Sequence, residues 1–192
     1  ATAFVQTTYR NIKVHQEMAP TPAFGDLNTD TWGILPASNA FNPFGEDTTF
    51  RHRLIEVGPR LFDIESDIFR VLPGVKFDIG DSWQAETAFL YNKVETIDFG
   101  KNFVSADALK EALASSDPAT AYNIFGAGLG INSPSVLDGL RVNTVRRAES
   151  ELRMFDVKAA GDVFELPGGT VALAVGAETA KEDTSDIGDS LS

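Results

Sequence analysis

The chain has no cysteine, only two histidines and no long apolar run. Without cysteine there can be no disulfide bond, no thiolate nucleophile and no cysteine-ligated metal. No stretch approaches the ~20 apolar residues that a transmembrane helix needs. Any contact with the interior of a membrane would therefore have to be made by β-strands.

Positive charge is scarce as well. Lysine and arginine number 16 against 28 aspartates and glutamates, which gives a net charge of −12. This balance argues against a nucleic-acid partner, because phosphate binding needs a basic surface. With 43% hydrophobic residues, a folded chain is expected rather than a disordered one. No signal-peptide-like stretch follows Ala1, which favours a mature product or a part excised from a larger polypeptide.

Alternation of apolar and polar residues dominates the chain. In one segment Phe69 and Val75 fall on one face, and Arg70 and Lys76 fall on the other. The same period of two predicts strands at about residues 4–16, 48–58, 67–79, 82–97, 151–166 and 170–180.

The last of these strands has unusually small side chains on one face. Val171, Leu173 and Val175 alternate with Ala172, Ala174 and Gly176. A membrane-barrel strand needs an apolar lipid face and an interior face that is small or polar. This pattern fits both requirements.

The connections between the strands fall into two sizes. Residues 80–82 and 167–169 are tight turns in which glycine permits a positive φ. Residues 17–47 and 98–147 are long loops. Short turns at one end of the strands and long loops at the other are typical of an outer-membrane barrel.

The second long loop is expected to contain a short helix at about residues 106–115. Ser105 is the predicted N-cap, and Asp117 with Pro118 ends the helix. The predicted fold class is therefore all-β: a segment of an antiparallel transmembrane β-barrel with long extracellular loops and a short loop helix. Two alternatives remain open at this point. One is a soluble all-β binding or adhesion domain built as a sandwich; the other is a self-contained barrel of about eight strands.

Counting strands gives a topology. If the two tight turns are periplasmic, strand 67–79 runs inward and strand 82–97 runs outward, which leaves segment 48–58 as one strand too many. We expect this segment to form an extracellular hairpin extension with the start of strand 67–79, turning near Asp63 to Ser66. Its charged face is consistent with an exposed position.

Six stretches carry a resemblance to a known family. They are "NAFNPFGED" (39–47), "RHRLIEVGPR" (51–60), "GDSWQAETAFLYNK" (80–93), "VSADALKEALASSDPATAYNIFG" (104–126), "ELPGGTVALAVGAE" (165–178) and "SDIGDSLS" (185–192). In this order and spacing they resemble the barrel region of TonB-dependent outer-membrane receptors. The resemblance implies a barrel of about 22 strands around an N-terminal plug. It also implies uptake of a scarce ligand of the siderophore, cobalamin or glycan type, energised by the TonB complex.

The chain departs from that family in three respects. It has no plug domain, no recognisable TonB box and no closing strand that ends in an aromatic residue. We therefore interpret residues 1–192 as part of a receptor barrel in the outer membrane. The expected partners are the lipid bilayer, the TonB complex through the absent plug, and a small-molecule or oligosaccharide ligand.

Nothing in the sequence indicates an enzyme, a cofactor or a metal centre. His15 and His52 are not spaced as ligands of one metal. The stretch "DLNTDT" (26–31) begins like a calcium loop but lacks the glycine and the glutamate that such a loop requires, so an Asx-rich turn is expected.

Two similar short segments indicate a candidate ligand site. "AFNPFG" (40–45) and "AYNIFG" (121–126) both lie in the long loops. One interpretation is structural: asparagine and glycine frame an aromatic residue that anchors the loop. The other is a vestibule where aromatic rings and amides contact a ligand, formed by Trp32, Asn39, Phe41, Asn42, Phe44, Tyr122, Asn123 and Phe125.

Overall fold

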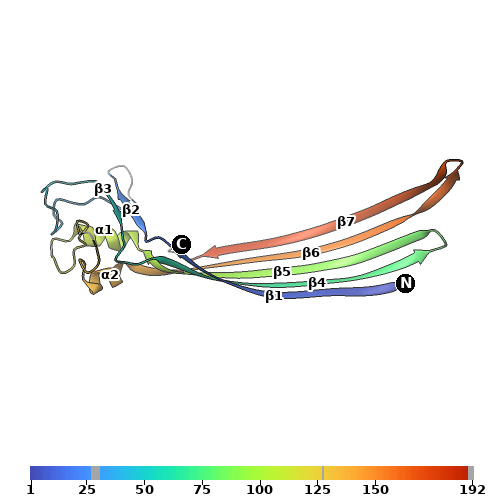
Figure 1. Ribbon diagram of the computed structural model, residues 1–192, viewed down its shortest axis with the longest axis horizontal. Coiled ribbons are helices and arrows are strands. Elements are labelled where there is room, and N and C mark those ends of the chain that lie inside the picture. Colours follow the sequence, from blue (N-terminus) through green and yellow to red (C-terminus); the bar gives the residue numbers. More distant parts are fainter. Residues whose placement is uncertain (27–30, 127, 190–192) are drawn as a thin grey trace. The chain divides into compact units, whose positions relative to one another are not determined.

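The computed structural model describes residues 1–26, 31–126 and 128–189. Within them, five long strands form one sheet in the order β1-β4-β5-β6-β7. Figure 1 shows neighbouring strands running in opposite directions, with tight turns joining β4 to β5 and β6 to β7. The strands are β1 (Thr2–Met18), β4 (Arg60–Ile79), β5 (Trp83–Val104), β6 (Arg141–Leu166) and β7 (Gly169–Gly188).

The chain divides into two compact units. The sheet unit comprises Ala1–Lys13, Glu65–Ile97 and Arg147–Ile187. The loop unit comprises Val14–Ile64, Asp98–Arg146 and Gly188–Ser192. In the described part of the sheet, β1 and β7 are the edge strands, and the sheet does not close on itself. The mostly antiparallel all-β class expected from the sequence is confirmed.

Five of the six predicted strands are present, and each is longer than predicted. β6 begins at Arg141 rather than near residue 151, and β7 continues to Gly188 rather than ending near residue 180. The missed ends are rich in charged residues on both faces, so they show no apolar alternation. Backbone pairing continues where the hydrophobic signal stops.

The prediction for segment 48–58 was wrong. Only Phe50–Arg53 is a strand, β3, and it pairs antiparallel with β2 (Pro22–Gly25). The expected turn near Asp63 to Ser66 is absent, because those residues lie inside the continuous strand β4. The apolar residues of the segment explain the difference: Leu54 and Val57 are buried in the core of the loop unit instead of lining a hairpin.

A hydrophobic core holds the loop unit together. Its fully buried large side chains are Leu35, Leu54, Val57, Leu109, Leu113, Tyr122 and Leu140. They come from both long connections, so the two loops fold as one body. The predicted helix is confirmed as α1 (Ala106–Ala114), whose N-cap Ser105 accepts a hydrogen bond from the Ala108 amide at 3.2 Å.

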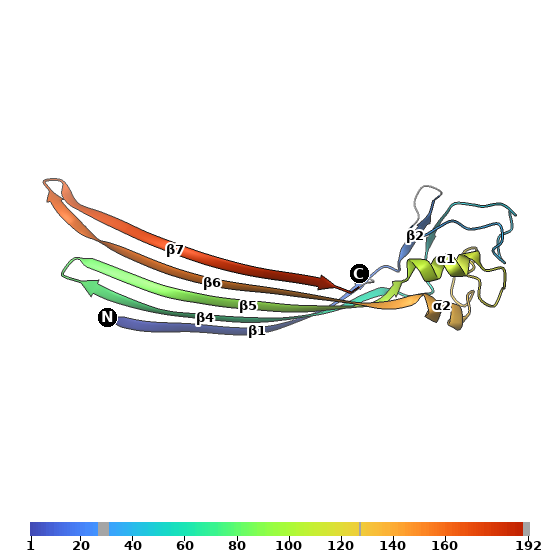
Figure 2. The ribbon, with the colours of Figure 1, turned by 180° about the vertical axis from the view of Figure 1, so that it is seen from behind.

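A second helix, α2 (Pro134–Leu140), was not predicted. It lies beside α1 in both ribbon views (Figures 1 and 2). Ser133 caps it and Pro134 occupies its first turn, both of which are ordinary start signals. The helix is only seven residues long, too short for a clear apolar period.

Candidate functional site

Contacts across the sheet unit place odd-numbered residues of all five strands on one face. Tyr9 reaches Asp67, Phe69 packs beside Tyr91, and Trp83 covers Gly161. Even-numbered residues meet on the other face, as with Lys158 beside Gly176 and Ser150 beside Glu182. We call these the odd face and the even face.

The odd face carries an exposed apolar band. Large hydrophobic residues of the sheet unit that are exposed have odd numbers, with the exceptions of Ile12, Phe164 and Leu166. The band comprises Val5, Phe69, Val75, Phe77, Ile79, Phe89, Phe155, Val157, Val163, Leu173 and Val175. Phe155, Leu173 and Val175 are each about half exposed, at 47%, 49% and 53%. An apolar surface that extends over five strands indicates a contact with lipid or protein.

Two tyrosines mark one border of the band. The Tyr9 hydroxyl donates to Asp67 at 2.7 Å, and the Tyr91 hydroxyl donates to Glu151 at 3.2 Å. Each ring therefore keeps its apolar body in the band and its hydroxyl on a carboxylate. Tyrosine favours such positions, where one end of the side chain is in an apolar environment and the other is hydrated.

Beyond the tyrosines the odd face becomes charged. Lys13 pairs with Glu65 at 3.0 Å, and Lys93 pairs with Glu149 at 3.2 Å. On the other side of the band, the Trp83 indole donates to the Asp162 carbonyl at 3.0 Å and leaves no room for a Cβ at Gly161. The apolar band is thus flanked by amphipathic aromatic residues on both sides.

The even face mixes charged side chains with partly buried apolar ones such as Leu72, Leu90 and Met154, and it carries a cluster that the sequence did not reveal. Glu86 on β5 forms ion pairs with Lys76 on β4 and with Lys158 on β6. Each lysine Nζ lies 3.2 Å from a Glu86 carboxylate oxygen. Lys76 also lies 5.7 Å from the ring centre of Phe4 on β1. Arg70, Leu72 and Lys76 line the same hollow, so the alternation continues past Pro73 without a change of face.

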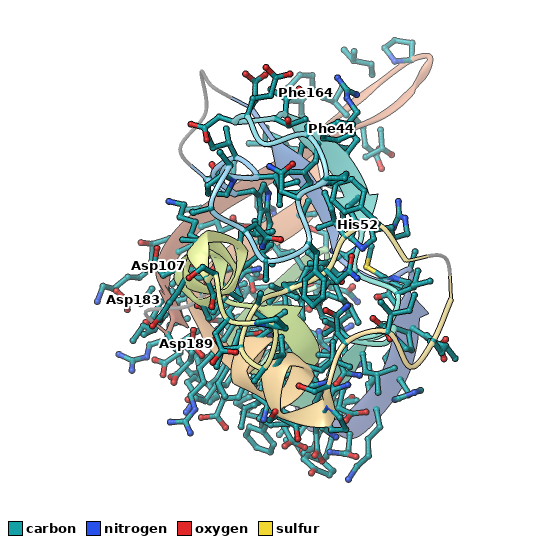
Figure 3. The ribbon with its side chains drawn as sticks, turned by 90° about the vertical axis from the view of Figure 1, so that its left-hand side faces the viewer. Phe44, His52, Asp107, Phe164, Asp183 and Asp189 are labelled. Atoms are coloured by element: carbon teal, nitrogen blue, oxygen red, sulfur yellow. The ribbon has the colours of Figure 1, made fainter. Side chains whose placement is uncertain are left out.

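In the loop unit, the similar segments 40–45 and 121–126 form the same type of turn and contact each other. Asn42 Oδ1 accepts from the Phe44 amide, and Asn123 Oδ1 accepts from the Phe125 amide, both at 2.9 Å. Each is an Asx turn that presents the following aromatic residue. The two rings contact edge to face, with centroids 5.9 Å apart, and are 59% and 45% exposed. Figure 3 shows Phe44 on its turn, well apart from Asp107 at the start of α1.

Other predicted site residues serve the core. Tyr122 is 1% exposed, and Asn39 is buried while its amide donates to the Leu113 carbonyl at 2.8 Å. Trp32 is partly buried against the same core, and Phe41 is half-buried. The structure therefore brings Phe44 and Phe125 together at the surface and places Tyr122 and Asn39 beneath it.

The carboxylate of Glu56 links the chain between β1 and β4 to the chain between β5 and β6. Glu56 accepts from the Ile131 amide at 2.8 Å and from the Asn132 side chain at 2.6 Å. Burial acts to raise the pKa of Glu56, but these hydrogen bonds outweigh it and hold the pKa below its usual value. The loop that receives Glu56 depends on Gly128 and Gly130, both with positive φ.

His52 lies half-buried beside Tyr122. Its Nε2 is 3.2 Å from the Tyr122 hydroxyl, and Figure 3 labels it on the segment that contains β3. Burial lowers the pKa of His52, which the charge of Glu56 opposes in part. Burial raises the pKa of Tyr122, and the same carboxylate adds to that effect. The histidine packs beside a core tyrosine.

No group of three or more histidine and carboxylate side chains suited to a metal ion is present in the described residues. Residues 27–30 of the expected Asx-rich turn lie outside them. Of the helices in the described part, none has the length and apolar character needed to span a membrane.

Comparisons with known proteins found no matching family model, no matching curated protein and no matching solved structure.

Proposed function

We propose that this chain is a wall segment of a TonB-dependent outer-membrane receptor, with its odd face against lipid and its loop unit outside the membrane. The observation that carries the proposal is the exposed apolar band on the odd face, flanked by Tyr9 and Tyr91 on one side and Trp83 on the other. An apolar band between aromatic girdles is the pattern of a membrane barrel.

The dimensions of the band support this assignment. Trp83 and Tyr91 are eight residues apart on β5, which is about 26 Å along a strand at ~3.3 Å per residue. With the ~40° tilt of a barrel strand, this corresponds to about 20 Å along the membrane normal, near the ~25 Å of a bacterial barrel. The charged strand ends beyond Tyr91 would then extend above the bilayer.

The loop unit suits a ligand vestibule. Its core fixes both long loops as one body, and the Phe44–Phe125 pair remains exposed on its surface. Exposed aromatic rings on a rigid support can stack on a sugar ring or on the apolar part of a chelate. In this proposal the chain catalyses no reaction and contributes to uptake by forming the wall and part of the entrance.

Fractionation of the cell envelope tests the membrane assignment. We expect the native polypeptide that contains this chain to be recovered in the outer-membrane fraction. It should resist extraction by high salt and by carbonate. Recovery of the polypeptide as a soluble species of about 20.7 kDa would overturn the proposal and favour the soluble all-β binding domain.

Uptake assays test the transport assignment. Cells with and without the intact gene would be given labelled cobalamin, a ferric siderophore and a maltooligosaccharide, with and without a proton uncoupler. Energy-dependent accumulation of at least one probe that requires the gene would support the proposal, and the double variant Phe44→Ala/Phe125→Ala should reduce its binding to cells. Accumulation that is independent of the gene for all three would contradict it.

A further inference from the structure

The two segments that carry the Phe44–Phe125 pair contain no charged residue. Residues 31–45 and 118–137 hold no aspartate, glutamate, lysine or arginine, although 23% of the residues of the chain are charged. Phe44 and Phe125 are both exposed, so an uncharged surface surrounds an accessible pair of rings.

The charged residues that border these two segments in the sequence are all acidic. They are Asp30, Glu46, Asp117 and Asp138. Glu56 adds a fifth carboxylate where it accepts from the Ile131 amide. Two cations approach elsewhere: Lys110 lies against Gly33, and Arg141 pairs with Asp138. Neither segment offers an anionic ligand an opposite charge, so the surface favours a ligand without net negative charge.

The orientation of the rings restricts the shape of the ligand. Their planes are inclined at 69° and their centroids are 5.9 Å apart. A single flat ligand, such as a corrin or a catecholate, can therefore stack on only one of them. Successive sugars of an oligosaccharide turn relative to each other about the glycosidic bonds, so a different sugar can pack its C–H face on each ring.

Hydrogen bonds hold both rings in place without a ligand. The Asn132 side chain accepts from the Asn123 amide at 2.7 Å and donates to the Asn123 carbonyl at 3.1 Å. Asn123 in turn holds the Phe125 amide. Below Phe44, the Asn42 side chain donates to two backbone carbonyls, at 2.9 and 3.0 Å. A support that is already ordered lowers the entropy cost of binding.

A polar donor lies beside the Phe125 ring. The side-chain oxygen of Asn123 accepts from the Phe125 amide at 2.9 Å, whereas its side-chain nitrogen has no acceptor among the described residues. This nitrogen is not buried, so a ligand can reach it. An amide N–H next to an aromatic ring can bind a sugar hydroxyl while the ring packs against the sugar.

We propose that Phe44, Phe125 and Asn123 bind an uncharged oligosaccharide. Each ring stacks on a different sugar, and the Asn123 side-chain nitrogen donates to a hydroxyl. The inference rests on the proposed function, because it names the ligand class of the same vestibule. It assigns sugars, rather than ferric siderophores or cobalamin, to this pair of rings.

Variants of the three residues should separate stacking from hydrogen bonding. Phe44→Ala and Phe125→Ala should each weaken binding about tenfold, because each removes one stacking contact. Phe44→Tyr keeps a ring and should bind as the wild type does. Asn123→Asp keeps the oxygen that forms the turn but loses the donor, so we expect a loss of about fivefold.

Calorimetric titration of the full native polypeptide, in micelles of a detergent without a sugar head group, measures these affinities. Maltohexaose, chitohexaose and mannohexaose are the neutral probes; hexagalacturonate, a ferric catecholate siderophore and cobalamin are the comparison. Phe24→Ala is the matched control, since Phe24 is 49% exposed on β2 of the same unit and lies outside the pair.

We expect at least one neutral oligosaccharide to bind more tightly than every comparison ligand. Its affinity should follow the order of the variants, remain unchanged in Phe24→Ala and be the same at low and high salt, because no ion pair forms.

The inference would be overturned if none of the neutral oligosaccharides bound, if both alanine variants kept wild-type affinity, or if Phe24→Ala weakened binding equally. Tighter binding of the acidic sugar, the siderophore or cobalamin would also overturn it and would leave the receptor proposal standing. The receptor proposal depends on fractionation and on uptake that requires the gene, which these titrations do not measure.

Discussion

The two units of this chain are built on opposite principles. The loop unit buries leucines, valines and a tyrosine in a shared core, whereas the buried hydrophobic residues described in the sheet unit are Ala85 and Ala88. The large apolar side chains of the sheet unit are on its surface instead. A sheet that exposes so many large apolar side chains needs an apolar environment or further strands to be stable. The comparison indicates that the loop unit supplies its own stability and the sheet unit takes its stability from its surroundings.

The largest expected effect is in the loop core. Leu113→Ala should destabilise the loop unit by about 2–5 kcal/mol, because Leu113 is fully buried and its truncation leaves a cavity. Hydrogen exchange at the amides of α1 would measure this loss. Protection of β5 and β6 amides in the sheet unit should change little, and an equal loss in both units would contradict the division.

A charge in the apolar band should be the next most damaging change. Leu173→Lys should destabilise the membrane-inserted protein by about 2–4 kcal/mol at mid-bilayer depth. Ala172→Lys, one residue away on the even face, is the control and should cost much less. Denaturant unfolding in phospholipid vesicles gives both values, and a similar cost at the two positions would contradict the assignment of faces.

Removing the carboxylate that joins the two loops should have a moderate effect. Glu56→Ala leaves the Ile131 amide without its acceptor and leaves the Asn132 side chain with the Asn123 carbonyl as its remaining acceptor, so we expect a loss of about 1–3 kcal/mol. Exchange of the Ile131 amide should accelerate accordingly. Glu46→Ala, at an exposed loop position, should have no comparable effect on that amide.

The smallest effect predicted is on pH dependence. The pKa of His52 is lowered in the folded chain from its usual 6.5, so the unfolded chain binds the proton more readily. The stability of the loop unit should hold above about pH 6.5 and decline as pH falls below it. The lowered pKa of Glu56 acts in the same direction, with a further loss below its usual 4.5.

Comparing unfolding at pH 7.5 and pH 5.5 measures the histidine effect. His52→Gln should abolish most of the difference between these two pH values. A difference of the same size in that variant would show that His52 is not its source.

The sequence predicts the part of the fold that depends on local alternation and misses the part that depends on distant pairing. The alternation of Phe69, Val75 and their polar neighbours located the second part of β4, but its start at Arg60 was missed. The start of β6 at Arg141 was not recognised, because charged residues on both faces remove the period. β2 and β3 are each four residues long and pair across the chain, so no local pattern reveals them.

The candidate site shows the same limit. Repeated asparagine and phenylalanine predicted two aromatic turns, and Asx turns at Asn42 and Asn123 are present. That Phe44 would contact Phe125 depends on how the two loops pack on one core. The same packing buries Tyr122 fully, whereas Phe41, its counterpart in the other segment, is only half-buried, and the sequence does not distinguish the two. The cluster around Glu86 was invisible because its members lie on three different strands.

The most direct test of the central claim is the accessibility of nitroxide labels along β7 in bilayers. Single-cysteine variants at Val171, Leu173 and Val175, with Ala172 and Ala174 as controls, would be labelled in the full native polypeptide and reconstituted in phospholipid vesicles. Oxygen concentrates in lipid, so we expect it to relax the labels at the odd positions more strongly than a water-soluble nickel chelate does. At the even positions we expect the nickel chelate to have the stronger effect. High accessibility to the nickel chelate at Leu173 and Val175 would contradict the assignment of the odd face to lipid.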